Sequence, residues 1–250
     1  MERPVGFFDS GLGGISVLRD AVRLLPNERF IFYGDNGNAP YGIKSREEIC
    51  ACTLRVVEEL MKYDVKALVV ACNTATSACV NDLRRALPIP VIGMEPALKP
   101  AHALRKSGQI LVMATPATLH LEKFERLMEK YGEGAVPVEG YGLVELIENG
   151  HLDDEAIVSC LHGLLDQWLA RPTDAIVLGC THYIFIKDAL ARVAPGVPLI
   201  DGNEGTVRQL ERVLEEQGLR AKAQGKGEVM LLTSGCAQSV LPLMHRLLEK

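Results

Sequence analysis

Two cysteines, Cys72 and Cys180, stand at matching places in two similar stretches of this sequence, residues 64–74 and 173–182. Each stretch has a polar lead-in, a short unbroken apolar run, a small residue, the cysteine, and then hydrogen-bonding side chains. Such a run predicts a strand buried on both faces, as in a parallel sheet. Ligands bind at the carboxyl edge of such sheets. The pattern therefore predicts two thiols that face one site.

A cysteine thiol becomes a useful base only where its surroundings favour the thiolate, as at a helix N-terminus or beside a cation. Both cysteines precede a predicted helix start, where backbone N–H groups stabilise negative charge. These amides could also hold a carboxylate, together with the side chains of Ser10, Asn73, Thr74 and Thr181. The alternative is that both cysteines pack as small hydrophobic residues at strand ends.

His182 and Asp9 are the other candidates for chemistry, and each has more than one interpretation. His182 could orient or ionise the thiol of Cys180, bind an anion, or ligate a metal. A zinc site needs about four ligands, and only Cys72, Cys180 and His182 are in place, so a metal is not expected. A Cys-His hydrolase needs one nucleophile and one base, which would leave one cysteine without a role. Asp9 is either a helix N-cap or an acid-base assistant.

Composition narrows the function class. The 250 residues are 48% hydrophobic, enough for a sizeable core in one large domain or two ordinary ones. The net charge of −5, without a cluster of basic residues, disfavours nucleic-acid binding. Apolar runs fall far short of the roughly 20 residues that span a bilayer. The N-terminus has no apolar signal region. Seven cysteines without framework spacing are typical of a reducing cytoplasm.

Strands and helices alternate along the chain. Besides the two cysteine stretches, strands are predicted at 5–8, 30–33, 90–93, 109–114, 136–138, 197–201 and 228–233. Helices are predicted at residues 15–25, 45–63, 75–86, 119–130, 143–148, 153–170, 204–216 and 238–248, and one more ends at about residue 193. The helix 45–63 begins with a Ser45–Glu48 capping box, and Asp153 is expected to cap the helix that reaches residue 170. A polar linker is predicted at 222–227. The glycine turn 11–14 does not fit the dinucleotide fingerprint.

The repeat around the cysteines extends to neighbouring segments and predicts the architecture. We expect an α/β fold with two similar lobes, each a mostly parallel sheet flanked by helices, and a site in the cleft between them. Residues 1–97 and 205–250 would form the first lobe, which carries Cys72, and residues 98–204 the second, which carries Cys180.

Four motifs, at residues 8–14, 33–42, 71–75 and 179–183, resemble those of bacterial glutamate racemases in the aspartate/glutamate racemase superfamily. The resemblance runs in the same order from the N-terminus to about Glu204. It implies a cofactor-independent isomerase that interconverts L- and D-glutamate and supplies D-glutamate for peptidoglycan in the cytoplasm. Glutamate would be its partner, without nucleic acid or membrane, and a homodimer stays an open alternative.

The resemblance also assigns roles by position. It implies that Cys72 and Cys180 are the two acid-base residues. It also implies a substrate site lined by Asp9, Ser10, Tyr41, Gly42, Asn73, Thr74, Thr118, Thr181 and His182. Glu148 would assist catalysis, as would Asp9 and His182. The sequence departs from the family pattern at Leu121, Phe124, Ile184 and Phe185.

The expected chemistry agrees with the residues. Inverting an α-carbon without a cofactor needs a base on each face, and the sequence offers no pyridoxal-type lysine site as an electron sink. The site's own hydrogen bonds must then stabilise the carbanion. Two thiols from facing lobes match this need. The alternatives are an aspartate or hydantoin racemase of the same superfamily, or a non-catalytic amino-acid-binding protein. His182 favours glutamate over aspartate by the same resemblance.

Overall fold

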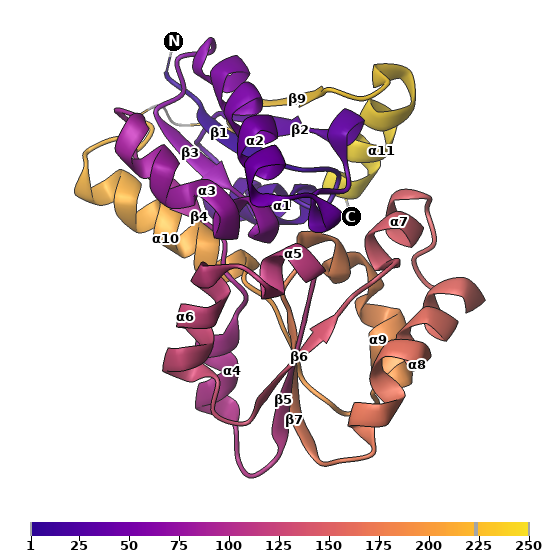
Figure 1. Cartoon of the computed structure of the whole chain (residues 1–250). Helices are drawn as coiled ribbons and strands as arrows, with labels where there is room; N and C mark the ends of the chain where they lie inside the picture. The colour runs from indigo at the N-terminus through magenta and orange to yellow at the C-terminus, as the bar shows by residue number, and fades with distance from the viewer. Residues whose placement is uncertain (1, 223–224, 250) are drawn as a thin grey trace.

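The computed structural model describes residues 2–222 and 225–249 and contains two parallel sheets, one in each lobe (Figure 1). The first lobe holds β1 (Val5–Asp9), β2 (Phe30–Gly34), β3 (Ala67–Val70), β4 (Val91–Gly93) and β9 (Val229–Thr233). The second holds β5 (Gln109–Ala114), β6 (Ala135–Glu139), β7 (Thr173–Leu178) and β8 (Leu199–Ile200). All strand pairs are parallel. The predicted α/β fold with two sheets is confirmed.

The two sheets repeat one strand order. The first runs β4-β3-β1-β2-β9, and the second, taken from its other end, runs β8-β7-β5-β6. The strands that lead to the cysteines, β3 and β7, therefore occupy equivalent positions beside the central strands β1 and β5. Strand β9 has no counterpart and extends the first sheet beyond β2. The similarity predicted from the two cysteine stretches thus covers four strands of each lobe.

Helices cover both faces of each sheet. In the first lobe, α1 packs against α10 and α11, and α2 packs against α3; in the second, α8 packs against α9, and α4 against α6. Their bounds are α1 (Ile15–Leu24), α2 (Arg46–Met61), α3 (Asn73–Ala86), α4 (Leu98–Leu104), α5 (Pro116–Leu119), α6 (Glu122–Tyr131), α7 (Leu143–Glu148), α8 (Glu155–Leu169), α9 (Lys187–Val193), α10 (Asn203–Glu216) and α11 (Ala237–Glu249). Short 3₁₀ helices are η1 (Asn36–Asn38), η2 (Tyr41–Ile43) and η3 (Thr181–Ile186).

The core has one apolar layer on each face of each sheet. Side chains alternate between the faces of a strand, so Phe7 packs under α1 while its neighbour Phe8 packs under α2 and α3. In the same way, Leu111 and Val112 of β5 enter the two separate clusters of the second lobe. Burial on both faces explains why these strands read as unbroken apolar runs.

Some predicted elements differ from the structure. The predicted helix 119–130 is two helices, α5 and α6, because Thr115 caps the first and the chain turns extended again at Leu121. Asp154, not Asp153, caps α8: its side chain accepts from the Ile157 N–H, whereas Asp153 pairs with Arg192.

The capping box that opens α2 forms as predicted. Residues 223–224 of the predicted linker lie outside the described residues. The boundaries between the lobes, at 97/98 and 204/205, stay a prediction.

Candidate active site

Both thiols line one small cavity between the lobes. The cavity measures about 10 Å³ and is lined by Ser10, Pro40, Tyr41, Gly42, Cys72, Asn73, Thr74, Thr115, Val144, Cys180, Thr181 and His182. Most residues that the sequence marked out therefore lie together. Three others, Asp9, Thr118 and Glu148, lie outside this lining but contact residues within it.

Cys72 follows β3 and is the N-cap of α3, as predicted. Its Sγ accepts the Ala75 N–H at 3.4 Å and donates to the Ser10 hydroxyl at 3.3 Å. The expectation that this helix start favours the thiolate is not met. Burial, followed by the nearby Asp9 carboxyl, raises the pKa of Cys72 to about 12. A pKa this high favours the protonated thiol.

Cys180 has a different setting. It precedes the 3₁₀ helix η3 instead of a regular helix, and no backbone N–H caps its side chain. Its Sγ lies 3.7 Å from Nδ1 of His182, while Nε2 of the same ring lies 2.6 Å from Glu148 Oε1. Burial would lower the pKa of His182, but its contacts with Cys180 and Glu148 outweigh burial and raise it well above 6.5. The raised pKa favours a protonated imidazole beside Cys180.

Glu148 connects the lobes. It ends α7 of the second lobe, yet its Oε1 accepts the Leu12 N–H of the first lobe at 2.8 Å. Its Oε2 accepts from the Asn36 amide at 3.4 Å. Burial would raise the pKa of Glu148, but the hydrogen bond with His182 and the other donors lower it overall. The result is a charged His182–Glu148 pair that the first lobe helps to hold.

Asp9 ends β1 and is fully buried. Its Oδ1 accepts the Gly11 N–H at 2.9 Å, and its Oδ2 accepts the Thr181 hydroxyl of the second lobe at 3.1 Å. It is not a helix N-cap, because Gly14 holds that position for α1. Burial raises the pKa of Asp9, although His182 and these hydrogen bonds oppose the shift. Asp9 is thus a buried carboxyl group whose pKa lies above its usual value.

The glycine turn explains how the lobes approach so closely. A Cβ on Gly13 would lie 2.3 Å from the Thr181 hydroxyl and 2.8 Å from the backbone nitrogen of His182. No side chain fits there. Besides forming a tight turn before a helix, the glycine therefore leaves room for the segment that carries Cys180 and His182.

Three hydroxyls from the two lobes form a triangle. Thr74 Oγ1 lies 2.9 Å from Thr115 Oγ1 and 3.0 Å from Thr118 Oγ1, and the last two are 2.9 Å apart. Beside them, both amide atoms of Asn73 are buried without a hydrogen-bond partner. Buried polar atoms are normally satisfied, so these groups suit a polar ligand. Thr115 was not among the predicted site residues, although it follows β5 as Ser10 follows β1.

Tyr41 and Gly42 close another side of the cavity from η2. The Tyr41 ring is buried, and its hydroxyl donates to Asp35 Oδ2 at 2.6 Å. A Cβ on Gly42 would lie 2.7 Å from Cβ of Thr115 in the other lobe. At Gly42, the loop therefore presents its backbone, without a side chain, to Thr115 of the second lobe.

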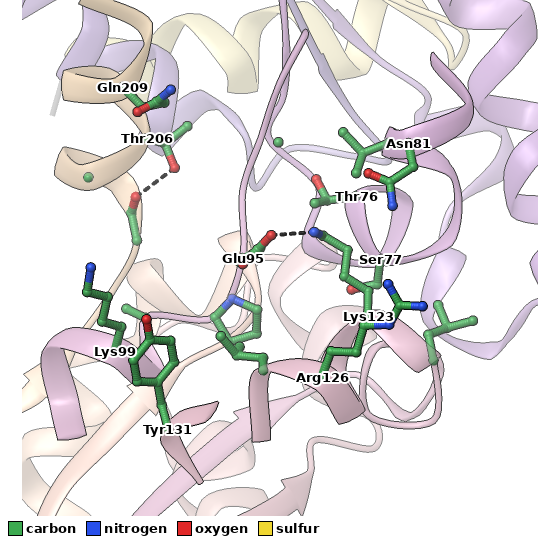
Figure 2. A pocket seen from close by; sticks show the side chains of 18 of the residues that line it. Thr76, Ser77, Asn81, Glu95, Lys99, Lys123, Arg126, Tyr131, Thr206 and Gln209 are labelled. Carbon is green, nitrogen blue, oxygen red and sulfur yellow. Dashed lines mark hydrogen bonds and ion pairs between the residues drawn. The ribbon is translucent and has the colours of Figure 1, made fainter. Parts of the chain in front are cut away.

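A second and larger cavity, of about 1270 Å³, contains neither thiol (Figure 2). It is lined by parts of α3, α6 and α10 and by the segments that join the lobes. Figure 2 shows Lys123 of α6 paired with Glu95 across it. None of the predicted site residues lines this cavity, so the smaller cavity is the candidate active site.

In the described ranges, 2–222 and 225–249, no group of three or more His, Cys, Asp or Glu side chains is arranged to hold a metal ion. Over the same ranges, no helix has the length and apolar character needed to cross a membrane.

Comparison with known proteins identifies the family. The sequence pattern of Asp/Glu/Hydantoin racemases matches residues 13–210. A glutamate racemase from Clostridium acetobutylicum is 49% identical over 99% of this chain and 98% of its own length. The chain belongs to the Asp/Glu/Hydantoin racemase family. The resemblance seen in the sequence motifs is thereby confirmed.

Solved structures of family members have the same two-lobed fold. Glutamate racemase from Thermus thermophilus, in complex with β-chloro-D-alanine, is 36% identical and matches with a TM-score of 0.85 over 98% of this chain and 93% of its own. Glutamate racemase from Francisella tularensis, in complex with D-glutamate, is 27% identical and matches with a TM-score of 0.87 over 100% of this chain and 94% of its own.

The four departures from the family pattern lie outside the lining of the small cavity. Phe124 is buried in the second lobe, and Leu121 packs partly against the first. Phe185 packs against the apolar clusters of both lobes, and Ile184 is half-buried. These residues fill space around the site and do not alter its polar groups.

Proposed function

We propose that this protein is a glutamate racemase that interconverts L- and D-glutamate by a two-base mechanism. The observation that carries the proposal is the placement of two thiols, from equivalent strands of two lobes, in one cavity. Support comes from relatives that match almost the whole chain and are glutamate racemases, such as the one from Clostridium acetobutylicum. The polar lining also suits a dicarboxylate with an ammonium group.

The chemistry follows from a thiol on each face of the α-carbon. With L-glutamate, Cys180 as thiolate takes the α-proton, the electron pair remains on carbon, and the Cys72 thiol delivers its proton to the opposite face. With D-glutamate, Cys72 is the base and Cys180 the acid. Each turnover leaves the proton on the other sulfur. His182, held by Glu148, assists at Cys180, and Asp9 assists at Cys72.

The carbanion needs stabilisation that the site must supply through hydrogen bonds. Ser10, Asn73, Thr74, Thr118 and Thr181 offer donors for the two carboxylates. Backbone N–H groups at Tyr41 and Gly42 can add to them without a side chain in the way. We infer that these residues, with Asp9 and His182, bind the substrate.

The direct test is circular dichroism of L-glutamate, and separately D-glutamate, incubated with the purified protein. Each trace should decay to zero as the racemate forms. Cys72→Ala and Cys180→Ala should each stop racemisation while the far-ultraviolet spectrum stays unchanged. Substantial racemisation by a folded variant of either kind contradicts the two-thiol assignment.

Heavy water distinguishes two bases from one. With a base on each face, the proton delivered to product comes from a thiol that has exchanged with solvent. Product formed in either direction should therefore carry deuterium at the α-carbon from the first turnovers, while recovered substrate stays largely protiated. A single base would label both forms or return the original proton.

The same assay separates the alternatives. Racemisation of L-aspartate at a rate comparable to L-glutamate would favour an aspartate racemase, and flat traces for both would favour a binding protein. Activity should survive dialysis against a chelator and treatment with hydroxylamine, because we propose that no cofactor takes part. The supply of D-glutamate for peptidoglycan, the cytoplasmic location and a homodimer stay predictions.

A further inference from the structure

The turn between β9 and α11 contacts the loop that carries Tyr41, although almost 200 residues separate them in sequence. The Ser234 hydroxyl donates to Asp35 Oδ1 at 2.5 Å and accepts the Gly37 N–H at 3.0 Å. The Ser234 N–H donates to the Gly34 carbonyl at 3.1 Å. This turn belongs to the strand that has no counterpart in the second lobe, so the symmetric part of the fold does not require it.

Asp35 is where these contacts meet. It is only 2% exposed, and its backbone N–H donates to the Asp9 carbonyl at 2.9 Å. Besides Ser234, its carboxylate accepts from the Asn38 amide at 2.9 Å and the Tyr41 hydroxyl at 2.6 Å. Hydrogen bonds to an ionised acceptor are short and strong. A buried carboxylate that loses one donor keeps an unsatisfied acceptor, which costs free energy and destabilises its position.

A parallel contact joins the same turn to the second lobe. The hydroxyl of Thr233 donates to Asn36 Oδ1 at 2.9 Å, and the Asn36 amide group donates to Glu148 Oε2 at 3.4 Å. Glu148 in turn holds His182. The turn is therefore connected to Tyr41 through Asp35, and to the Glu148–His182 pair through Asn36.

We propose that the β9–α11 turn is part of the active-site scaffold, and that Ser234 is a positioning residue for Tyr41 and Gly42 through Asp35. This inference rests on the proposed function for its kinetic consequence only. The hydrogen bonds of Ser234 go to Gly34, Asp35 and Gly37, none of which lines the small cavity, so its effect must pass through this loop, where Asp35 contacts Tyr41. Since the loop binds substrate and holds no reacting atom, its disorder should weaken substrate binding more than it slows the chemical step.

The test is a double-mutant cycle with Ser234→Ala and Tyr41→Phe, measured as racemisation kinetics. Ser234→Ala should raise KM about tenfold and change kcat less than about twofold. In the Tyr41→Phe background, where the hydroxyl bond to Asp35 is already gone, the same change should raise KM less than about threefold. Ser234→Thr keeps a hydroxyl and should restore most of the affinity.

The matched control is Ser239→Ala, which removes another exposed hydroxyl near the same turn. Ser239 donates to the Cys236 carbonyl and does not contact the loop, so this variant should behave as the wild type. Equal effects of Ser234→Ala in both backgrounds, or none in either, would overturn the inference. Wild-type racemisation in the same assay keeps this outcome separate from failure of the proposed function.

Hydrogen exchange gives a readout that needs no substrate. In Ser234→Ala, backbone amides of residues 35–42 should exchange about tenfold faster, while those of β5 stay unchanged. Unaltered exchange in the loop would contradict the proposed role of the turn.

Discussion

Cys72 and Cys180 have unlike neighbours. Beside Cys72 are a neutral hydroxyl and Asp9, and burial keeps the pKa of this thiol high. Beside Cys180 is the imidazole of His182, whose pKa is raised by its contacts with Cys180 and Glu148 against the effect of burial. The high pKa of Cys72 favours a proton on this sulfur, and the raised pKa of His182 favours a cation next to Cys180. This arrangement fits removal of a proton from L-glutamate by Cys180.

The His182–Glu148 pair should make stability depend on pH. The raised pKa of His182 contributes stability that is fully present below 6.5 and is lost as pH rises through the folded-state pKa. The lowered pKa of Glu148 contributes stability that is present above 4.5 and is lost as pH falls through its folded-state pKa. Both contributions are present between these values.

We expect Glu148→Gln to lower the free energy of unfolding by about 2 kcal/mol in that window. The loss relative to the wild type should shrink as pH falls below 4.5 and as it rises well above 6.5. Denaturant titrations across the pH range measure it. Glu145→Gln changes another carboxylate on the same helix and serves as the control. A difference that did not change with pH would mean that the pair is not charged.

At the scale of the elements, close contact between η2 and α5 should be needed for activity. Gly42→Ala would place a methyl group 2.7 Å from Cβ of Thr115 and push the lobes apart. Because misplacement of about 1 Å can cost a hundredfold in rate, kcat/KM should fall about a hundredfold. Gly163→Ala in α8 meets no atom within 4 Å and should leave activity unchanged. Equal activity of the two variants would show that the lobes need not approach this closely.

The elements predicted correctly from the sequence are those with a clear local signal. Unbroken apolar runs marked β1, β3, β5 and β7, and the Ser45–Glu48 capping box marked the start of α2. The prediction failed where tertiary contacts decide. Nothing local shows that the chain turns extended at Leu121, or that η3 replaces a regular helix after Cys180.

The candidate site was predicted from strand ends and motifs, but not its electrostatics. Helix position suggested two activated thiols, whereas burial raises the pKa of Cys72. Burial depends on how the lobes meet, which no local pattern encodes. Asp35 and Ser234 were missed for the same reason, because their roles rest on contacts between distant segments. Thr115 was missed although it follows β5 as Ser10 follows β1.

For the whole molecule, the size of the small cavity implies movement. A space of about 10 Å³ is at the limit for one water molecule, far too small for an amino acid. The lobes or their loops must therefore separate to admit substrate. The thiols themselves are only 5% and 7% exposed, at Cys72 and Cys180, so they too become accessible mainly in an open form.

Alkylation by iodoacetamide should report this opening. Cys236 is exposed, and hydrogen bonds from Ser239 lower its pKa, so it should react first, before most of the activity is lost. Cys72 and Cys180 should react at least about tenfold more slowly, and activity should fall with them. Glutamate should slow only this second phase. Peptide mass spectrometry over time checks it, and inactivation that followed Cys236 instead would contradict a closed site.

The unlike neighbours of the two thiols carry a thermodynamic consequence. Enantiomers have equal free energies in an achiral solvent, so the equilibrium constant of the proposed reaction is one whatever surrounds each sulfur. The ratio kcat/KM must then be identical for L- and D-glutamate, in the wild type and in every variant. Asp9 on one side and the His182–Glu148 pair on the other can change kcat and KM differently for the two enantiomers only if kcat/KM remains the same for both. The asymmetry can instead decide which form of the free enzyme accumulates, the form with the proton on Cys72 or the form with the proton on Cys180.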